Sequence, residues 1–149
     1  MATRILFVCL GNICRSPAAE GVFRVLSRQA GLELEIDSAG TGGWHIGDAP
    51  YGPMQAAALQ RGYDLSGLRA RQFGPADFDD FDLIIGMDAE NITDMERLRP
   101  AGNSTPVRLF TDYAPETGAD YVPDPYYTRD FAGALALVEK ASFGLIAAL

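Results

Sequence analysis

Two residues that could carry out covalent phosphoryl chemistry lie close together near the start of the sequence. Cys9 is followed by Leu10, Gly11, Asn12, Ile13 and Cys14, and then by Arg15 and Ser16, which gives the pattern Cys-x5-Arg-Ser. A thiolate is a strong nucleophile, and a guanidinium, which is always charged, can bind two oxygens of one phosphoryl group. The spacing therefore predicts that Cys9 attacks a phosphoryl group held by Arg15.

The residues around this pair suit a loop that wraps around a phosphoryl group. Successive backbone N–H groups at a helix N-terminus supply donors for the phosphoryl oxygens. Gly11 and Asn12 tolerate the left-handed backbone angles that such a loop usually requires. The positive surroundings would stabilise the thiolate of Cys9, and the Ser16 hydroxyl could donate to the sulfur. The alternative is a buried cysteine at a strand end near a surface arginine, and the combined pattern favours catalysis.

An acid must come from elsewhere in the chain, because the leaving oxygen of a phosphotyrosine needs a proton. Asp124 is the candidate, in the segment Val-Pro-Asp-Pro-Tyr-Tyr at 122–127, where a proline on each side restricts the backbone. Tyr126 and Tyr127 could form the wall of a slot for an aromatic ring. By itself this segment would be a proline-rich surface turn. The need of the loop for an acid favours the catalytic interpretation.

Strands and helices alternate along the sequence. Apolar runs predict strands at 4–8, 34–37, 83–85 and 106–110, and helical spacing predicts helices at 17–30, 53–61, 89–98 and 131–149. The first helix is expected to have Ser16 as its N-cap and Pro17 at its first position. Segment 111–129 is expected to be irregular. The alternation predicts an α/β fold with one domain over 1–149: a four-stranded parallel sheet, helices on both faces, and the phosphate-binding loop after the first strand.

Composition narrows the class of protein. The 149 residues are 48% hydrophobic and 21% charged, which is typical of one folded soluble domain. The net charge of −8 argues against a nucleic acid or an anionic membrane as partner. No apolar run is expected to span a membrane, and no signal peptide is evident, so a cytoplasmic location is expected. Two cysteines suit a reducing compartment, and the single histidine, His45, argues against a metal site built from cysteine and histidine.

The chain resembles the low-molecular-weight protein tyrosine phosphatases over nearly its whole length. The resemblance is carried by residues 6–17, by Asp-Ser-Ala-Gly-Thr at 37–41, Ala-Arg-Gln at 70–72, Met87-Asp88 with Asn91, and Asp-Pro-Tyr-Tyr at 124–127. It implies hydrolysis of phosphotyrosine through a phosphocysteine on Cys9, without a cofactor. Arg15 would clamp the phosphate, and Asp124 would act first as general acid and then as base toward water.

The resemblance also implies supporting roles. Asn12 and Ser38 would hold the strained loop through hydrogen bonds. Trp44, Tyr126 and Tyr127 would line the substrate slot. Cys14 would trap an oxidised Cys9 as a reversible disulfide. The alternatives are that Trp44 is an ordinary half-buried aromatic residue and that Cys14 is a small buried residue at a helix start.

One position departs from the family pattern. Many members carry a histidine shortly before the Ala-Arg-Gln segment, where it helps to support the loop. Here residues 66–69 read Ser-Gly-Leu-Arg, and His45 lies instead beside Trp44. We expect Leu68 to leave the chemistry intact and to change the support of the loop.

Three other functions stay open at this point. Arsenate reduction would need an external thiol, because the chain has no third cysteine. Phosphoarginine phosphatases resemble this chain but carry threonine at the position of Ile13, and an apolar isoleucine suits an aromatic ring better. A phosphotyrosine-binding module without activity is disfavoured, because the candidate nucleophile, clamp and acid are all present.

The expected partners are a phosphotyrosine-containing protein and a cognate tyrosine kinase, and the chain is expected to be mainly monomeric.

Overall fold

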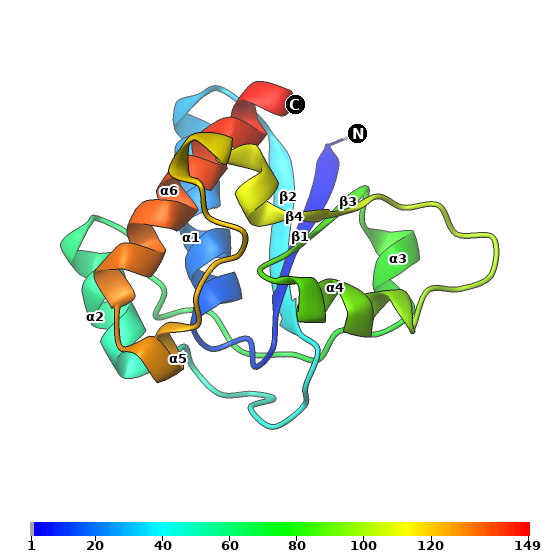
Figure 1. Ribbon diagram of the computed structural model, residues 1–149, viewed down its shortest axis with the longest axis horizontal. Coiled ribbons are helices and arrows are strands. Elements are labelled where there is room, and N and C mark those ends of the chain that lie inside the picture. The colour runs from blue at the N-terminus through cyan, green and yellow to red at the C-terminus, as the bar shows by residue number, and fades with distance from the viewer. Residues whose placement is uncertain (1) are drawn as a thin grey trace.

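The computed structural model describes residues 2–149 and contains a parallel sheet with helices on both faces (Figure 1). Its strands are β1 (Thr3–Cys9), β2 (Leu34–Gly40), β3 (Leu83–Gly86) and β4 (Val107–Leu109). They are arranged in the order β2-β1-β3-β4, and every neighbouring pair is parallel. The predicted α/β class and the four predicted strands are confirmed.

The central strand β1 is buried on both sides, which explains its unbroken apolar run. Ile5 and Phe7 face one hydrophobic cluster, and Leu6 and Val8 face the other, as the alternation of side chains in a strand requires. All four side chains are fully buried. β1 therefore forms a rigid support that ends directly at Cys9.

The helices form a layer on each side of the sheet (Figure 1). One layer contains α1 (Arg15–Gln29), α2 (Gly52–Gln60), α5 (Pro125–Thr128) and α6 (Phe131–Ala148), and the other contains α3 (Asp77–Asp80) and α4 (Ala89–Glu96). The 3₁₀-helices η1 (Phe110–Tyr113) and η2 (Pro115–Thr117) follow β4. α1 packs between the sheet and α6, so the helix that follows the candidate loop is held on two sides.

The start of α1 differs from the prediction. The helix begins at Arg15 with Cys14 as its N-cap, and the cap residue makes no side-chain capping hydrogen bond. The prediction of Ser16 as N-cap and Pro17 as first helical residue is therefore wrong. Ser16 lies inside the first turn, and its hydroxyl contacts the side chains of Cys9 and Asn12 instead of free helix N–H groups. A tertiary contact has overridden the local capping preference of serine.

Several smaller elements were also missed. The helix α3 was not predicted, and segment 111–129, which was expected to be irregular, contains η1, η2 and α5. β4 was expected to extend to Phe110, but that residue begins η1. These elements have three or four residues each, which is too short for hydrophobic periodicity to reveal them.

The C-terminal helix α6 corrects another expectation. By length and composition alone it could cross a membrane, although no such run was expected from the sequence. Here its inner stripe is buried, and it packs against α1, α2 and η1. The contact with η1 is close: a Cβ at Gly144 would lie 1.7 Å from the carbonyl oxygen of Tyr113. Glycine at this position allows the helix to dock.

The carboxyl ends of the parallel strands gather the candidate residues at one edge of the sheet. β1 ends at Cys9, β2 carries Ser38 near its end, and Asp88 follows β3. Gly40 at the end of β2 lies against the candidate loop, and a Cβ there would be 2.8 Å from the carbonyl oxygen of Leu10. This edge thus brings the loop close to the backbone of the neighbouring strand.

Candidate active site

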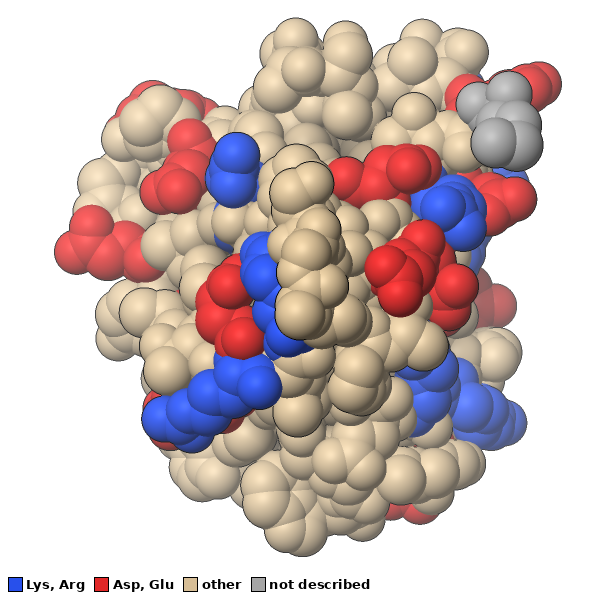
Figure 2. Space-filling model, turned by 90° about the vertical axis from the view of Figure 1, so that its right-hand side faces the viewer, with Lys and Arg blue, Asp and Glu red and all other residues tan. Residues whose placement is uncertain are grey.

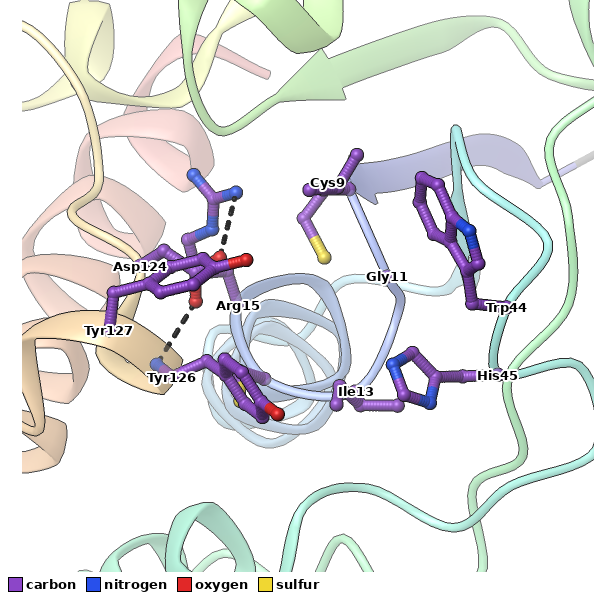
Figure 3. Close-up of a pocket in the computed structure, with 11 residues that line it drawn as sticks. Cys9, Gly11, Ile13, Arg15, Trp44, His45, Asp124, Tyr126 and Tyr127 are labelled. Atoms are coloured by element: carbon purple, nitrogen blue, oxygen red, sulfur yellow. Dashed lines mark hydrogen bonds and ion pairs between the residues drawn. The ribbon is translucent and has the colours of Figure 1, made fainter.

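The sulfur of Cys9 points into a pocket above the N-terminus of α1 (Figure 3). Its Sγ lies 3.0 Å from Ser16 Oγ, and the backbone N–H of Asn12 donates to it at 3.3 Å. The hydroxyl of Ser16 can donate a second hydrogen bond to the sulfur. One backbone donor, one hydroxyl that can donate either to the sulfur or to the carbonyl of Ala39, and the positive end of a helix therefore surround the atom that would carry negative charge.

Asn12 holds the shape of the loop. It has a left-handed backbone, with φ of 57°. Its side-chain NH₂ donates to Ser16 Oγ at 2.8 Å and to Ser38 Oγ at 2.9 Å, and its Oδ1 accepts the backbone N–H of Arg71 at 3.0 Å. The buried amide thus connects the loop with α1, β2 and the segment before α3.

Gly11 differs from the prediction, because only Asn12 in this loop has a positive φ. The reason for glycine at position 11 is space. A Cβ there would lie 3.2 Å from Cδ2 of His45, so the side chain of His45 packs against the bare backbone.

A second layer of hydrogen bonds supports Asn12 from behind. The hydroxyl of Ser38 donates to Glu20 at 2.6 Å, and Arg24 donates to the other oxygen of Glu20 at 2.7 Å. Arg24 also donates to the carbonyl of Ile36 at 2.8 Å. Glu20 is buried, so its charge needs these partners. Glu20 and Arg24 were not predicted, although their i,i+4 spacing on one helix was visible in the sequence.

Arg15 is buried beneath the pocket and oriented by fixed acceptors. Its Nη1 donates to Asp88 at 2.7 Å and to the carbonyl of Val122 at 3.0 Å. Its Nε is buried without a hydrogen-bond partner among residues 2–149. Burial opposes its charge, but the Cys9 sulfur and the carboxylates of Asp88 and Asp124 raise the pKa of Arg15 overall. A permanent cation with a free donor is therefore held beside Cys9, which fits the oxygens of a phosphoryl group.

Asp88 is a site residue that sequence reasoning missed. One of its oxygens accepts the backbone N–H of Asn91 at 2.7 Å and caps α4, and the other holds Arg15. Its position two residues after a buried strand, at the carboxyl edge of the sheet, was the signal that could have identified it.

Asp124 comes to the pocket from a distant part of the sequence. It is the N-cap of α5, where its Oδ1 accepts the backbone N–H of Tyr126 at 3.1 Å. Its Oδ2 lies 3.6 Å from Nη2 of Arg15. The buried Val122 fixes the preceding backbone, since its N–H donates to Met87 at 2.9 Å. The carboxylate is thus presented beside the guanidinium and across the pocket from the sulfur (Figure 3).

The pocket has a volume of about 250 Å³ and is polar at its floor and aromatic at its rim. Its floor consists of residues from the loop 9–15, and its walls are Trp44, His45, Asp124, Tyr126 and Tyr127. The two tyrosines lie on one side, and Trp44 with His45 lies on the other (Figure 3). Trp44 is 73% exposed, so it is a rim residue and not the half-buried aromatic of the alternative interpretation. The shape fits a phosphate at the bottom and a flat ring above it.

His45 is another wall residue that was not predicted to line the site. Its Nδ1 lies 3.1 Å from a carboxylate oxygen of Asp48, which orients the ring. Among residues 2–149, no group of three or more His, Cys, Asp and Glu side chains is arranged to hold a metal ion.

Cys14 shares the loop with Cys9 but has different surroundings. It is buried, and both cysteines are free. Burial raises the pKa of Cys14 to about 12, and the nearby Asp124 and Cys9 also raise it. Cys14 therefore stays protonated at neutral pH.

Charged side chains elsewhere on the surface are arranged differently from those of the pocket. Figure 2 shows a face on which Lys and Arg side chains lie among Asp and Glu side chains. At the end of α4, Arg97 and Arg99 pair with Asp94 and Glu96. These basic side chains are thus neutralised locally, whereas the donors around Cys9 converge on one point.

Comparison with known proteins agrees with this geometry. Residues 4–149 match the family model described as low molecular weight phosphotyrosine protein phosphatase. The chain belongs to this family. It is 44% identical over 147 residues to the low molecular weight protein-tyrosine-phosphatase YfkJ of Bacillus subtilis, covering 97% of this chain and 94% of that protein. It is 46% identical, over an alignment of 156 residues, to the low molecular weight protein-tyrosine-phosphatase of Streptomyces coelicolor; the alignment covers all of this chain and 94% of that protein.

Solved structures of the family have the same fold. The crystal structure of YfkJ from Bacillus subtilis superposes with a TM-score of 0.94 at 43% identity, covering 99% of this chain and 94% of that one. A structure described as DARP, drosophila arginine phosphatase, superposes with a TM-score of 0.91 at 28% identity, covering 97% and 96% of the two chains. The fold is therefore shared with a protein that is named for a different phosphorylated residue.

Leu68 lies in the segment where the resemblance led us to expect a histidine. Its side chain is partly buried and packs against the hydrophobic core. On this side of the loop, Asn12 is held by the backbone N–H of Arg71, which does not depend on a histidine side chain. Arg24 is the basic side chain that pairs with Glu20.

Proposed function

We propose that this protein hydrolyses phosphotyrosine in proteins through a phosphocysteine intermediate on Cys9. In the first step the Cys9 thiolate forms a bond to phosphorus, the bond to the tyrosyl oxygen breaks, and Asp124 gives that oxygen its proton. In the second step Asp124 takes a proton from water, the water oxygen binds phosphorus, and the bond to sulfur breaks. The products are tyrosine, inorganic phosphate and the original thiolate.

The observation that carries this proposal is the convergence of donors on one sulfur. Ser16, the N–H of Asn12 and the N-terminus of α1 surround Sγ of Cys9, and Arg15 lies beside it with its Nε unpaired among residues 2–149. These groups stabilise negative charge on the sulfur and on the phosphoryl oxygens, where charge develops in the transition state. Donors that are already in place support phosphoryl transfer, and a cysteine that is only buried would not need them.

The placement of Asp124 supports its role as acid and base. The carboxylate faces the pocket beside Arg15, whose cation can also contact the phosphate. A carboxyl group in this place can reach the leaving oxygen in the first step and the attacking water in the second, because both occupy the position opposite the sulfur.

The aromatic rim supports tyrosine as the substrate side chain. Tyr126, Tyr127 and Trp44 enclose a slot over the loop, and aromatic rings stack or pack edge to face in such slots. Ile13 also lines the pocket and presents an apolar surface without a hydroxyl. These features favour phosphotyrosine over phosphoarginine, and the presence of an acid favours hydrolysis over binding alone.

The intermediate can be tested directly. We expect mass spectrometry of a reaction quenched during turnover to show a phosphate on Cys9, and we expect none in the Cys9→Ser variant. Cys14→Ser is the matched control, because it removes the other thiol of the loop. A fresh, reduced protein that hydrolyses aryl phosphates without a phosphorylated Cys9 would contradict the proposed mechanism.

Substrate choice can be tested on the same preparation. We expect turnover of tyrosine-phosphorylated peptides that vanadate inhibits, and much slower turnover of phosphoarginine. Reduction of arsenate with an added small thiol is expected to be absent. Equal rates for phosphoarginine and phosphotyrosine would contradict the substrate class and leave the phosphocysteine chemistry in place.

The setting of the enzyme is part of the same proposal. A free thiolate nucleophile requires a reducing environment, which supports a cytoplasmic location. A phosphotyrosine phosphatase acts against a tyrosine kinase that supplies its substrate. We expect the protein to be mainly monomeric, and sedimentation at micromolar concentration measures this.

A further inference from the structure

Tyr51 connects the two halves of the site. Its backbone N–H donates to the carbonyl of Ile13 in the phosphate-binding loop at 2.8 Å. Its ring lies 5.3 Å from the ring of Tyr126, and its hydroxyl accepts a hydrogen bond from Nη1 of Arg129 at 2.9 Å. One residue thus contacts the loop that holds Cys9, a residue in the first turn of α5, whose N-cap is Asp124, and the C-cap of that helix.

Arg129 closes that helix in an unusual conformation. It has a φ of 63°, and Asn12 is the other non-glycine residue with a positive φ among residues 2–149. Such a backbone is unfavourable for a side chain with a Cβ, and it persists where surrounding contacts hold it. The guanidinium of Arg129 lies over two rings, 5.3 Å from the centre of Tyr51 and 5.1 Å from the centre of Phe131.

The turn that carries Asp124 has few other supports. The helix α5 has four residues, of which Pro125 is buried, whereas Tyr126 is 44% exposed and Tyr127 is 72% exposed. On its N-terminal side the backbone is fixed by the buried Val122. On its C-terminal side the contacts of Arg129 with Tyr51 perform the same task. Without them, the position of the Asp124 carboxylate would depend on that N-terminal anchor, on the buried Pro125 and on the ion pair with Arg15.

We propose that Tyr51 and Arg129 are positioning residues. They hold the carboxylate of Asp124 at the distance from the phosphate-binding loop at which it can reach the leaving oxygen. The proposal rests on the proposed role of Asp124 as general acid. The described residues that line the pocket include neither of the two, so they act through the turn and not through the substrate. The hydrogen bond and the stacked guanidinium fix the end of α5 to a residue that is itself tied to the loop.

The dependence of the rate on the leaving group tests this role. Phenyl phosphate has a poor leaving group that needs a proton, whereas p-nitrophenyl phosphate has a good one that hardly needs it. We expect Arg129→Asn to lower kcat/KM for phenyl phosphate about 10-fold, a partial loss of general acid catalysis, and to change it less than about 2-fold for p-nitrophenyl phosphate. Asparagine is chosen because it tolerates a left-handed backbone.

Tyr51→Phe isolates the hydrogen bond. It removes the hydroxyl that Arg129 contacts and keeps the ring under the guanidinium, so we expect the same selective loss to be smaller, about 3-fold for phenyl phosphate. The double variant is expected to lose no more than Arg129→Asn alone, because both changes break one contact. Tyr63→Phe is the matched control, since Tyr63 follows the C-terminal end of α2, opposite the end that Tyr51 caps, and donates its hydroxyl to Glu139 at 2.8 Å. It should leave the ratio of the two rates unchanged.

The variant Asp124→Ala separates this proposal from the one on which it rests. A large selective loss in Asp124→Ala together with equal losses for both substrates in Arg129→Asn and Tyr51→Phe would overturn the positioning role and leave the acid in place. Unchanged rates in both variants would overturn it as well. No selective loss in Asp124→Ala would remove the acid role and, with it, the positioning role.

Discussion

The phosphate-binding loop and the turn that carries Asp124 face each other across one pocket and are built in opposite ways. The loop is buried, and Asn12 ties it to three other segments with hydrogen bonds of 2.8 to 3.0 Å. The turn is a four-residue helix with exposed tyrosines, and its carboxylate accepts one backbone hydrogen bond.

The difference fits the two proposed tasks. Donors for phosphoryl oxygens stabilise a transition state only if they are already in place, since reorganising them during the reaction costs free energy. A general acid needs only to reach the leaving oxygen once the substrate is bound, and it must leave room for the substrate to enter. A firmly held phosphate-binding loop, combined with an Asp124 turn that has fewer hydrogen bonds, fits both needs.

The largest expected effect on kcat/KM comes from a change in the phosphate-binding loop. Arg15→Lys keeps a positive charge but loses the planar fork and the contacts with Asp88 and Val122. We expect kcat/KM to fall about 10³-fold, and equally for phenyl phosphate and p-nitrophenyl phosphate, because the phosphoryl group is common to both. The inhibition constant of inorganic phosphate should rise as well. A loss that depended on the leaving group would mean that Arg15 acts through Asp124. The phosphate-binding loop and the turn that carries Asp124 would then not have separate roles.

The next effect comes from the turn. Asp124→Ala is expected to lower kcat/KM for phenyl phosphate about 10²-fold, which is a usual contribution of a general acid. The inhibition constant of inorganic phosphate should stay within about 2-fold, since the donors of the floor are untouched. Asp124→Asn is a useful control, because it keeps the size of the side chain and cannot give up a proton. Rates equal to those of the native enzyme would remove Asp124 from the acid role.

Sequence reasoning succeeded where chemistry and local structure coincide. The candidate nucleophile, the candidate clamp and the loop form one short segment, and the alternation of strands and helices indicated the fold class and the edge at which the loop lies. Asp124 was expected at the site because the loop required an acid and two prolines marked a stiff turn; the structure places it in the pocket wall, and its role as acid stays a prediction. All of these signals act over a few residues or follow from the chemistry of one segment.

Asn12 and Ser38 were expected to support the loop, but Asp88, Tyr51 and Arg129 were missed because their roles depend on contacts between distant segments. Asp88 meets Arg15 across 73 residues, and Arg129 meets Tyr51 across 78. A lone aspartate after a strand, or an arginine after a turn, has many uses, and the sequence does not say which side chains will be neighbours. The wrong N-cap has the same origin: Ser16 was assigned by its local preference, while its hydroxyl is used by Cys9.

A third prediction concerns the stability of the floor. Asn12→Ala removes the donors for Ser16 and Ser38 and leaves the backbone N–H of Arg71 without its acceptor. Buried groups that lose partners, together with a left-handed backbone that alanine disfavours, should lower the free energy of unfolding by about 3 kcal/mol. Urea denaturation measures this. Asn12→Gly, which tolerates the backbone, separates the two causes and should lose less.

The smallest effect concerns Cys14 and pH. Its pKa is about 12 in the folded protein, against 9.0 for an exposed thiol, so the folded state binds this proton more tightly. The resulting stability is complete below pH 9.0 and is lost as the pH rises toward 12. At a pH about midway between these values the loss should be on the order of 2 kcal/mol.

Comparison with Cys14→Ala isolates this contribution, because all other titrating groups are shared. Between neutral pH and the midway pH, the native protein should lose more stability than the variant, as measured by urea denaturation. Alkylation gives a second measure: at neutral pH iodoacetamide should modify Cys9 and spare Cys14, because the thiolate is the reactive form. Modification of both at equal rates, or parallel pH profiles of stability, would mean that the two sulfurs of the loop share one environment. The phosphate-binding loop would then not give Cys9 and Cys14 different reactivities.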